Sequence, residues 1–403
     1  MAIRIGRRRL HLGTYFDLVR ALDARIMENF KPPREGEIRK VAVFRADRIG
    51  DAFVCLPLFL EMDKRYELSV FSSPYNDFIL RKAGLKTEVY DNPAFYKEDS
   101  FAEFVRGLFF FNTTFPFRLL WGRLKSGTPR YDLFLLQDLS PIRRDFIVDA
   151  EPSARLLASP FLGPFVLPFA NLLLFRRYLI TDPKPSPIAQ YYQAVRYFDP
   201  GFSFVPRTDA LNFLAENGKE TFRLPVGKFF LFHVGGKPNR LLQDRCVVDF
   251  LNQVDVSVVV IDDESKATLQ RLKKQVKNSK VSWVLSDHSL FEYLSLVLDD
   301  RCVGYIGYDG GHSHLLSLPK SSVTLYTMGE HEKWRTYTGN PYRKIGLREG
   351  ISLEYSPLGD TTKAVLYRDL ACSPCYYHPC SDPVCRAVPL ADCWEPMRRL
   401  FGL

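Results

Sequence analysis

Three short loops of this chain combine charged side chains with glycines, and each follows a run of apolar residues. They span residues 45–51, 233–240 and 309–314. Apolar runs that end in such loops are typical of strands in parallel α/β domains, which bind their ligands at the carboxyl ends of the strands. The residue types in the loops predict acid–base chemistry in the first and binding of an anionic ligand in the other two.

The first loop ends in Asp51, where the chain enters an apolar helix. The carboxylate of Asp51 could act as a general base that takes a proton from an attacking hydroxyl. Alternatively, Asp51 could only cap the N-terminus of that helix. Gly50 permits a close approach of the backbone to a ligand, and Arg45 and Arg48 add positive charge.

The second loop follows the apolar run that ends at His233 and places two glycines before two cations. Lys237 and Arg240 could neutralise a diphosphate. The alternative is a solvated basic loop without a ligand. The loop lacks the complete Gly-x-x-x-x-Gly-Lys-Ser/Thr pattern of phosphate-binding ATPases, so the sequence does not favour an ATPase.

The third loop has Asp309 followed by Gly310 and Gly311 at the start of a helix. Glycines at this position free backbone N–H groups to point at a phosphate, and the helix dipole favours the same ligand. A plain glycine turn is the alternative. His312 and His314 are two residues apart and do not share a helix face, which argues against a metal site formed by this pair.

Short apolar strands alternate with helical segments on both sides of these loops, which predicts two parallel α/β sheets. The expected strands are Val41–Phe44, Leu68–Phe71, Thr87–Tyr90 and Tyr131–Leu136, then Phe229–His233, Val256–Ile261, Ser282–Leu285, Val303–Ile306 and Val323–Tyr326. The expected helices of the second half are Asp244–Gln253, Glu264–Val276, Leu290–Leu298 and His312–Leu318.

The chain has 403 residues, enough for two or three domains. We predict a basic amphipathic extension over 1–38 and a first α/β domain over 39–215, with an aromatic and apolar insert near 105–180. A second α/β domain is predicted over 216–370. The remaining residues, 371–403, form a cysteine-rich tail that we expect to pack back on the first domain.

The composition is that of a globular protein, with 46% hydrophobic residues and a net charge of +9. Residues 1–40 hold ten Lys or Arg against five Asp or Glu, which suits an anionic partner such as lipid head groups. An amphipathic helix is expected over Thr14–Phe30. The uncharged segment 156–175 is long enough to span a bilayer, but its three prolines argue against a transmembrane helix. Packing against the rest of the protein and partial insertion into the membrane surface are the alternatives.

Eight cysteines are present. We expect Cys55, Cys246 and Cys302 to be buried as small apolar side chains. The other five lie near the C-terminus, where a structural zinc site, reduced packing cysteines and disulfides remain as alternatives. The zinc ligands would be Cys372, Cys375, Cys380 and Cys385.

Together these loops resemble the motifs of glycosyltransferase family 9, the heptosyltransferases of lipopolysaccharide core synthesis. The resemblance rests on Gly50-Asp51 before an apolar helix with Pro57, on His233-x-Gly-Gly followed by a cation, and on Asp309-Gly310-Gly311-His312-Ser313-His314. Trp334 and the spacing of the C-terminal cysteines are also similar to that family. The resemblance covers roughly residues 40–395.

The resemblance implies a GT-B fold, in which two Rossmann-like parallel-sheet domains face each other across a cleft, and an inverting reaction without a metal cofactor. The domain over 39–215 would then bind the acceptor, and the domain over 216–370 the nucleotide sugar. It assigns Asp51 as the catalytic base, with Arg45, Arg48 and Gly50 on the acceptor side. The implied donor-binding residues are Arg240, Lys237, Glu264, Asp309, Gly310, Gly311, His312 and His314. Asp262 and Asp263 compete with Glu264 for the ribose-binding role.

The expected function is transfer of a heptose-like sugar, with ADP-heptose as donor and a lipopolysaccharide-core or related glycolipid as acceptor. The expected location is the cytoplasm, with peripheral attachment to the inner membrane. Gly310 stands where the family has Ser or Thr, and Leu241-Leu242 where Trp-Pro is common. These departures motivate an alternative, a non-catalytic GT-B module that binds sugar nucleotide or glycolipid. A nucleic-acid partner is not expected, because no recognised nucleic-acid-binding module is present.

Overall fold

The computed structural model divides the chain into two compact units, Met1–Phe204 and Val205–Leu403. The boundary therefore lies earlier than the predicted one after residue 215. The structure describes residues 2–5, 8–11, 38–46, 48–91, 131, 133–137, 146–149, 178–180, 186–217, 222, 224–262, 266–285, 287–327, 331–371 and 383–403. The predicted helix Thr14–Phe30 and the segments 108–125 and 156–175 lie outside these residues.

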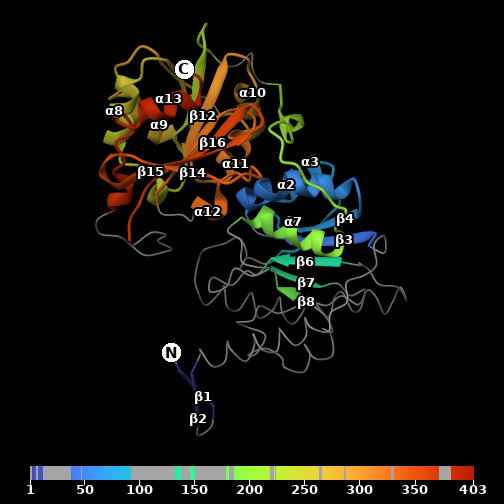
Figure 1. Ribbon diagram of the computed structural model, residues 1–403. Coiled ribbons are helices and arrows are strands. Elements are labelled where there is room, and N and C mark those ends of the chain that lie inside the picture. Colours follow the sequence, from blue (N-terminus) through green and yellow to red (C-terminus); the bar gives the residue numbers. More distant parts are fainter. Residues whose placement is uncertain are drawn as a thin grey trace. The chain divides into compact units, whose positions relative to one another are not determined.

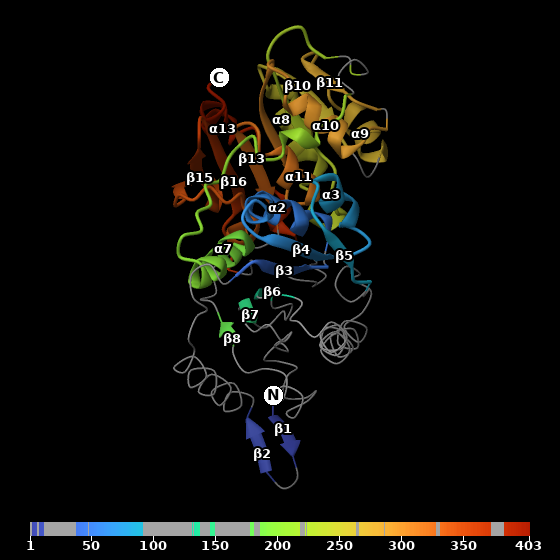
Figure 2. The same ribbon diagram turned by 90° about the vertical axis from the view of Figure 1, so that its right-hand side faces the viewer.

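The first unit contains a six-stranded sheet in the order β5-β4-β3-β6-β7-β8 (Figures 1 and 2). Its strands are β3 (Lys40–Arg45), β4 (Glu67–Ser72), β5 (Thr87–Val89), β6 (Leu133–Gln137), β7 (Phe146–Asp149) and β8 (Tyr178–Ile180). Its helices are α2 (Ile49–Asp63), α3 (Asp77–Lys82) and α7 (Pro187–Phe198). Strands β5, β4, β3 and β6 are parallel, whereas β7 pairs antiparallel with both of its neighbours, β6 and β8. A separate antiparallel hairpin joins β1 (Ala2–Ile5) to β2 (Arg8–His11).

Apolar side chains explain where these elements form. The β3 residues from Val41 to Phe44 are all buried, as expected for a central strand covered on both faces. In α2 the buried residues recur at helical spacing, and Phe59 meets the ring of Tyr191 from α7 edge-on at 5.3 Å. The Tyr191 hydroxyl donates to the carbonyl of Phe44 at 3.0 Å, which ties α7 to β3.

The second unit contains an eight-stranded sheet in the order β11-β10-β9-β12-β13-β16-β15-β14. Its strands are β9 (Phe229–His233), β10 (Ser257–Ile261), β11 (Val281–Trp283), β12 (Cys302–Tyr308), β13 (Ser322–Tyr326), β14 (Arg343–Gly346), β15 (Ile351–Leu358) and β16 (Thr361–Arg368). Its α-helices are α8 (Asp244–Gln253), α9 (Lys266–Lys273), α10 (Leu290–Val297), α11 (Gly311–Leu316), α12 (His331–Trp334) and α13 (Trp394–Leu400). Short 3₁₀ turns are η2 (Asn212–Leu214), η4 (Pro238–Arg240), η5 (Arg348–Gly350) and η6 (Val384–Arg386).

Six strands of this sheet, β11-β10-β9-β12-β13-β16, are parallel and follow the order 3-2-1-4-5-6 of a doubly wound Rossmann fold. The first unit begins in the same way, with 3-2-1-4 over β5-β4-β3-β6. The predicted fold class, with two Rossmann-like α/β domains, is confirmed. Antiparallel pairings, which the sequence analysis did not predict, extend one edge of each sheet: β7 and β8 in the first, β15 and β14 in the second.

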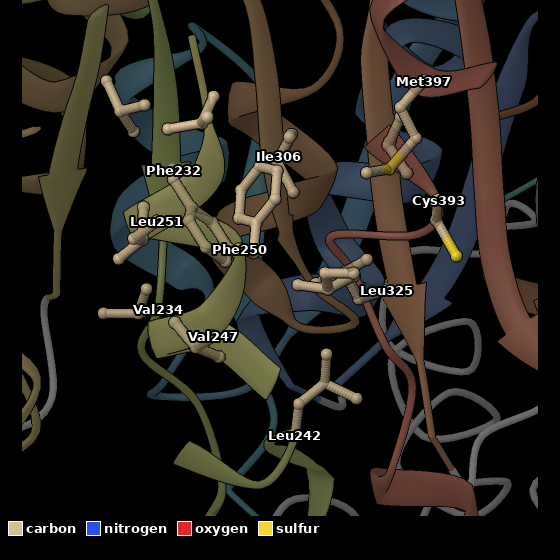
Figure 3. Close-up of a cluster of buried hydrophobic side chains, with 14 of the residues drawn as sticks. Phe232, Val234, Leu242, Val247, Phe250, Leu251, Ile306, Leu325, Cys393 and Met397 are labelled. Carbon is tan, nitrogen blue, oxygen red and sulfur yellow. The ribbon is translucent and has the colours of Figure 1, made fainter. Parts of the chain in front are cut away.

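The main core of the second unit lies on one face of its sheet, and Figure 3 shows part of it. Alternate residues of the strands point to it, such as Phe230 and Phe232 of β9. Helices α8 and α9 supply Val247, Phe250 and Leu269. The opposite face carries α11, because the hydroxyl of Tyr305, an intervening residue of β12, lies 2.9 Å from Ser313 Oγ.

The C-terminal tail completes this core. Cys393 and Met397 are buried against strands of the second unit, as Figure 3 shows, and the ring of Phe401 stacks on Phe230 at 6.1 Å between centroids. The prediction that the tail packs back on the first domain is therefore wrong for its described part, residues 383–403. The reason is burial: the apolar side chains of this segment join the same core as those of α8 and α9, on one face of the second sheet.

The prediction that three cysteines are buried is confirmed. Cys55, Cys246 and Cys302 are all buried within the two units. Burial raises the pKa of the Cys302 thiol to about 12, so it stays protonated at neutral pH. These thiols act as small apolar groups in the core.

Candidate functional site

Loops 233–240 and 309–314, which were predicted to bind an anionic ligand, lie at the point where the strand order of the second sheet reverses. Strand β9 neighbours β12, with His233 in register with Gly307, so the loops that follow the two strands leave the sheet side by side. The loop after β9 contains η4, and the loop after β12 leads into α11. Ligands of open α/β sheets bind at this switch point, outside the carboxyl ends of the strands.

Arg240 and Asp309 join the two loops. Arg240 Nη1 lies 3.0 Å from Asp309 Oδ2, and the exposed fraction of the side chain is 31% for Arg240 but 7% for Asp309. The hydroxyl of Thr327, which follows β13, donates to the Arg240 carbonyl at 2.9 Å. The buried carboxylate thus orients a guanidinium that is still accessible to a ligand.

The histidines of both loops gather around this pair. His314 Nε2 lies 3.9 Å from Asp309 Oδ1, and the ring centroids of His233 and His312 are 5.3 Å apart. Trp334 of α12 approaches His314 at 6.4 Å between ring centroids. Loops 233–240 and 309–314 therefore form one site. Among the residues that the structure describes, no group of three or more His, Cys, Asp and Glu side chains could hold a metal ion.

Helix α11 begins directly after Gly310, whose backbone is extended, and it is six residues long. Ser313 holds the first turn in place, because its hydroxyl contacts both the Tyr308 carbonyl and the Tyr305 hydroxyl. Gly307 makes this packing possible, since a Cβ there would overlap the Tyr305 hydroxyl. A helix this short has a weak macrodipole, so backbone N–H groups and nearby cations must carry any anion binding here.

The other predicted donor residues lie in two places. Lys237 is exposed at the start of η4, and its carbonyl accepts from the Arg240 N–H at 2.8 Å. The preceding Gly236 has a φ of +140°, which favours glycine. Glu264 and Asp263 lie outside the described residues. The competing Asp262 is buried at the end of β10, where its carbonyl accepts from the Tyr293 hydroxyl at 3.3 Å.

In the first unit, Asp51 forms an ion pair with Arg45. Arg45 Nη2 lies 3.4 Å from Asp51 Oδ1, and Arg45 Nε donates to the Asp51 carbonyl at 3.2 Å. The side chain of Arg45 is 1% exposed, whereas that of Asp51 is 17% exposed. The buried guanidinium fixes the orientation of a carboxylate that solvent and ligands can still reach.

The interpretation of Asp51 as a helix cap is wrong. The N-cap of α2 is Arg48, so Gly50 and Asp51 lie within the first helical turn. The end of β3 is held by the Asn76 side chain, which donates to the Arg45 carbonyl at 2.7 Å. The loop after β3 also lies at a switch point of its sheet, between β3 and β6. Asp51, the predicted base, therefore stands where α/β sheets bind ligands.

A polar cluster that the sequence analysis did not single out surrounds Glu354 of β15. Its carboxylate accepts from the Tyr367 hydroxyl at 2.6 Å and from Arg335 Nη1 at 2.5 Å, and His331 Nε2 lies 3.6 Å away. The nearby His331, together with the hydrogen bonds from Tyr367 and Arg335, lowers the pKa of Glu354 to about 2. The cluster holds α12, and with it Trp334, beside the sheet.

The signal for this cluster was present in the sequence but weak. Tyr326 and Tyr367 stand at or near the carboxyl ends of β13 and β16, two parallel neighbours in the sheet. A polar aromatic residue at the end of a strand is a candidate for ligand contact, but only once the strand is recognised. Strands β15 and β16 were not predicted.

The C-terminal cysteine prediction falls mostly outside the described residues. Cys372, Cys375 and Cys380 lie there, whereas Cys385 belongs to η6. Among the helices that the structure describes, none is both long and apolar enough to cross a membrane.

No protein-family model matches this sequence, and no curated protein matches it significantly. Solved structures of similar fold include a family 9 glycosyl transferase from Veillonella parvula, with 13% identity over 76% of this chain and 85% of that chain and a TM-score of 0.45. The E. coli heptosyltransferase WaaC with ADP is similar at 13% identity over 72% and 88%, with a TM-score of 0.43. The UDP-GlcNAc 2-epimerase from Neisseria meningitidis bound to UDP-GlcNAc has 14% identity over 72% and 82%, with a TM-score of 0.36.

Proposed function

We propose that the protein is an inverting, metal-independent glycosyltransferase that uses a nucleotide diphosphate sugar. The second unit binds the donor through the loops after β9 and β12, and the first unit supplies the base, Asp51. The observation that carries the proposal is the Arg240–Asp309 pair at the switch point of the second sheet, 3.0 Å between Nη1 and Oδ2.

The donor site fits a diphosphate leaving group. Negative charge develops on the diphosphate as the glycosidic bond breaks, and preorganised cations and backbone N–H groups stabilise it. Arg240 is the oriented cation, and Lys237 is an exposed cation at the start of the same turn. The N–H groups around Gly310 and Gly311 add donors at the end of the neighbouring strand.

The proposed reaction is a single displacement. The oxygen of an acceptor hydroxyl attacks the anomeric carbon of the donor sugar, and the bond from that carbon to the diphosphate oxygen breaks. Asp51 takes the proton of the attacking hydroxyl. Because one displacement occurs without a covalent intermediate, the configuration at the anomeric carbon inverts. The ion pair with Arg45 keeps the Asp51 carboxylate in one orientation for this transfer.

The motif resemblance favours ADP-heptose as the donor and a lipopolysaccharide-core or related glycolipid as the acceptor. Such an acceptor resides in a membrane with anionic head groups, and the excess of Lys and Arg in residues 1–40 favours contact with them. We therefore place the protein at the cytoplasmic face of the inner membrane as a peripheral protein. Arg48 and Gly50, beside the base, are proposed to contact the acceptor.

A thermal-shift panel tests the donor site first. ADP, UDP, GDP and CMP are compared, each with and without its sugar, because a ligand that binds only the folded state raises the apparent stability. The proposal expects ADP and ADP-heptose to give the largest shifts. Arg240→Met should abolish the shift, whereas Asp51→Asn should keep it and lower the transfer rate by about 10²- to 10⁴-fold.

The outcomes separate this proposal from the alternative. Nucleotide binding without any sugar transfer to a glycolipid acceptor by the wild-type protein would support the non-catalytic module. Transfer that Asp51→Asn leaves intact would remove Asp51 as the base. Absence of binding to every nucleotide in the panel would contradict the donor site itself.

A further inference from the structure

Tyr326 is the last residue of β13, the strand next to β12, and its two chain neighbours each contact one of the two loops of the proposed donor site. Its neighbour Leu325 accepts from the Asp309 N–H at 3.0 Å, and its other neighbour, Thr327, donates to the Arg240 carbonyl at 2.9 Å. The residues on both sides of Tyr326 therefore hold the two partners of the Arg240–Asp309 pair. This places Tyr326 at the carboxyl edge of the sheet, within the proposed donor site.

The hydroxyl of Tyr326 is buried without a hydrogen-bond partner among the described residues, and the residue is 2% exposed. The hydroxyls of two other tyrosines nearby do have hydrogen-bond partners. The Tyr342 hydroxyl donates to the Thr336 carbonyl at 2.9 Å, and the Tyr367 hydroxyl donates to Glu354 at 2.6 Å. Buried polar groups in folded proteins nearly always have a hydrogen-bond partner. We therefore expect a bound ligand to supply the partner of the Tyr326 hydroxyl.

The surroundings of the phenol indicate what kind of ligand that is. Burial raises the pKa of Tyr326 well above its ordinary value, and the Asp309 carboxylate raises it further, while Arg240 and Arg335 act in the opposite direction. The phenol is thus neutral at physiological pH and can donate a proton in a hydrogen bond. Arg240 next to it attracts an anion, and the phosphate oxygens of an anion accept such bonds.

We propose that Tyr326 is a further donor-binding residue, whose hydroxyl donates a hydrogen bond to a phosphate oxygen of the nucleoside diphosphate held by Arg240. This inference rests on the proposed function, because it uses the same donor site. The residue would contribute to recognition of the diphosphate itself and not of the sugar or the base.

The test compares Tyr326→Phe with the wild-type protein by isothermal titration with ADP, UDP and inorganic pyrophosphate. Because the removed hydroxyl has no partner in the unliganded protein, the melting temperature of Tyr326→Phe should equal or exceed that of the wild type. The dissociation constants for the probes that the wild type binds should rise by about ten-fold to thirty-fold, since hydrogen bonds to charged acceptors are the stronger ones. The factor should be the same for pyrophosphate and for the nucleotide.

Tyr342→Phe is the matched control. It removes a hydroxyl that is already bonded to the Thr336 carbonyl, so it should lower the melting temperature and leave the dissociation constants unchanged. Unchanged binding by Tyr326→Phe, in a wild-type protein that does bind the probes, overturns this inference alone. An effect on the nucleotide without one on pyrophosphate also overturns it. A wild-type protein that binds none of the probes overturns the proposed donor site and this inference together.

Discussion

Arg386 of η6 is joined to the loop that carries Arg240 by two hydrogen bonds in opposite directions. Its Nε donates to the Leu241 carbonyl at 2.6 Å, and its own carbonyl accepts from the Gln243 N–H at 2.9 Å. Leu242, between these two contacts, is buried in the main core. The C-terminal tail thus fixes the residues that directly follow Arg240.

This relationship predicts that a change in the tail weakens donor binding. Arg386→Met removes the side-chain bond to Leu241, which is worth about 1 kcal/mol, and frees the end of the loop. We expect the melting temperature to fall by a few degrees, and the dissociation constant for ADP to rise by about three-fold to ten-fold. Both can be measured on the same preparation by calorimetry.

Arg386→Lys is the control, because lysine retains a donor and a positive charge at this position. Its affinity for ADP should lie between those of the wild type and Arg386→Met. A loss of stability with unchanged ADP affinity in Arg386→Met would show that the contact only supports the fold.

A second prediction concerns the ion pair between Arg45 and Asp51. Replacing Asp51 by a neutral residue removes one charged partner of the buried Arg45 guanidinium, and the loss of a charged partner in a buried pair costs stability. Asp51→Asn should therefore lower the free energy of unfolding by about 2 kcal/mol. The double variant Arg45→Met with Asp51→Asn should lose less than the sum of the two single variants.

A double-mutant cycle in urea measures this coupling, which we expect to be about 1–2 kcal/mol. Strictly additive effects would contradict an energetic link between the two side chains. The exposed pair Arg207 and Asp209, separated by 2.6 Å between Nη2 and Oδ2, is the matched control, with an expected coupling below about 1 kcal/mol.

The sequence predicted the parallel strands and the site loops well, because both depend on local patterns. Phe229–His233 is a continuous apolar run, and its predicted bounds match β9. The amphipathic pattern of Asp244–Gln253 matches α8. The loops after β9 and β12 meet only if these two strands are neighbours. The common Rossmann strand order makes them neighbours, and the structure places Arg240 beside Asp309 accordingly.

The strands β15 and β16 were missed because charged side chains interrupt their apolar patterns. Glu354 of β15 and Lys363 of β16 are both buried. The ammonium of Lys363 is satisfied by the carbonyls of Ser317, Leu318 and Lys320, at 2.9, 2.7 and 2.5 Å. Such partners are distant in sequence, so a local pattern cannot reveal that a charge will be buried.

A third prediction concerns metal removal. If Arg240 and Lys237 neutralise the leaving diphosphate, as proposed, transfer should not need a divalent ion. The transfer rate with EDTA should stay within about two-fold of the rate with Mg²⁺, since no Lewis acid then acts in the displacement. A rate that falls with EDTA and recovers with Mg²⁺ would contradict this. The metal content of the purified protein, measured in parallel, tests the cysteine tail for structural zinc.

The last prediction is the acid sensitivity of the Glu354 cluster. The pKa of Glu354 is about 2 in the folded protein, chiefly because His331 lies close to the carboxylate, against an ordinary value of 4.5. A carboxyl whose pKa is lowered by folding stabilises the folded state above its unfolded pKa, and this contribution is lost as the pH falls from 4.5 towards 2. Glu354→Gln should lower the free energy of unfolding at pH 7 by about 2 kcal/mol.

Urea unfolding of the wild type and Glu354→Gln between pH 7 and pH 3 measures this contribution. The difference between the two proteins should be constant above about pH 5 and shrink below it, because only the wild type loses an ionised Glu354. Glu395→Gln is the control, since Glu395 is exposed and its ion pair, with Arg399 on the same helix at 3.1 Å, is one between two solvent-exposed side chains. Its difference from the wild type should be small at every pH. A Glu354→Gln difference that stays constant down to pH 3 would show that the carboxylate does not carry the stability of the cluster.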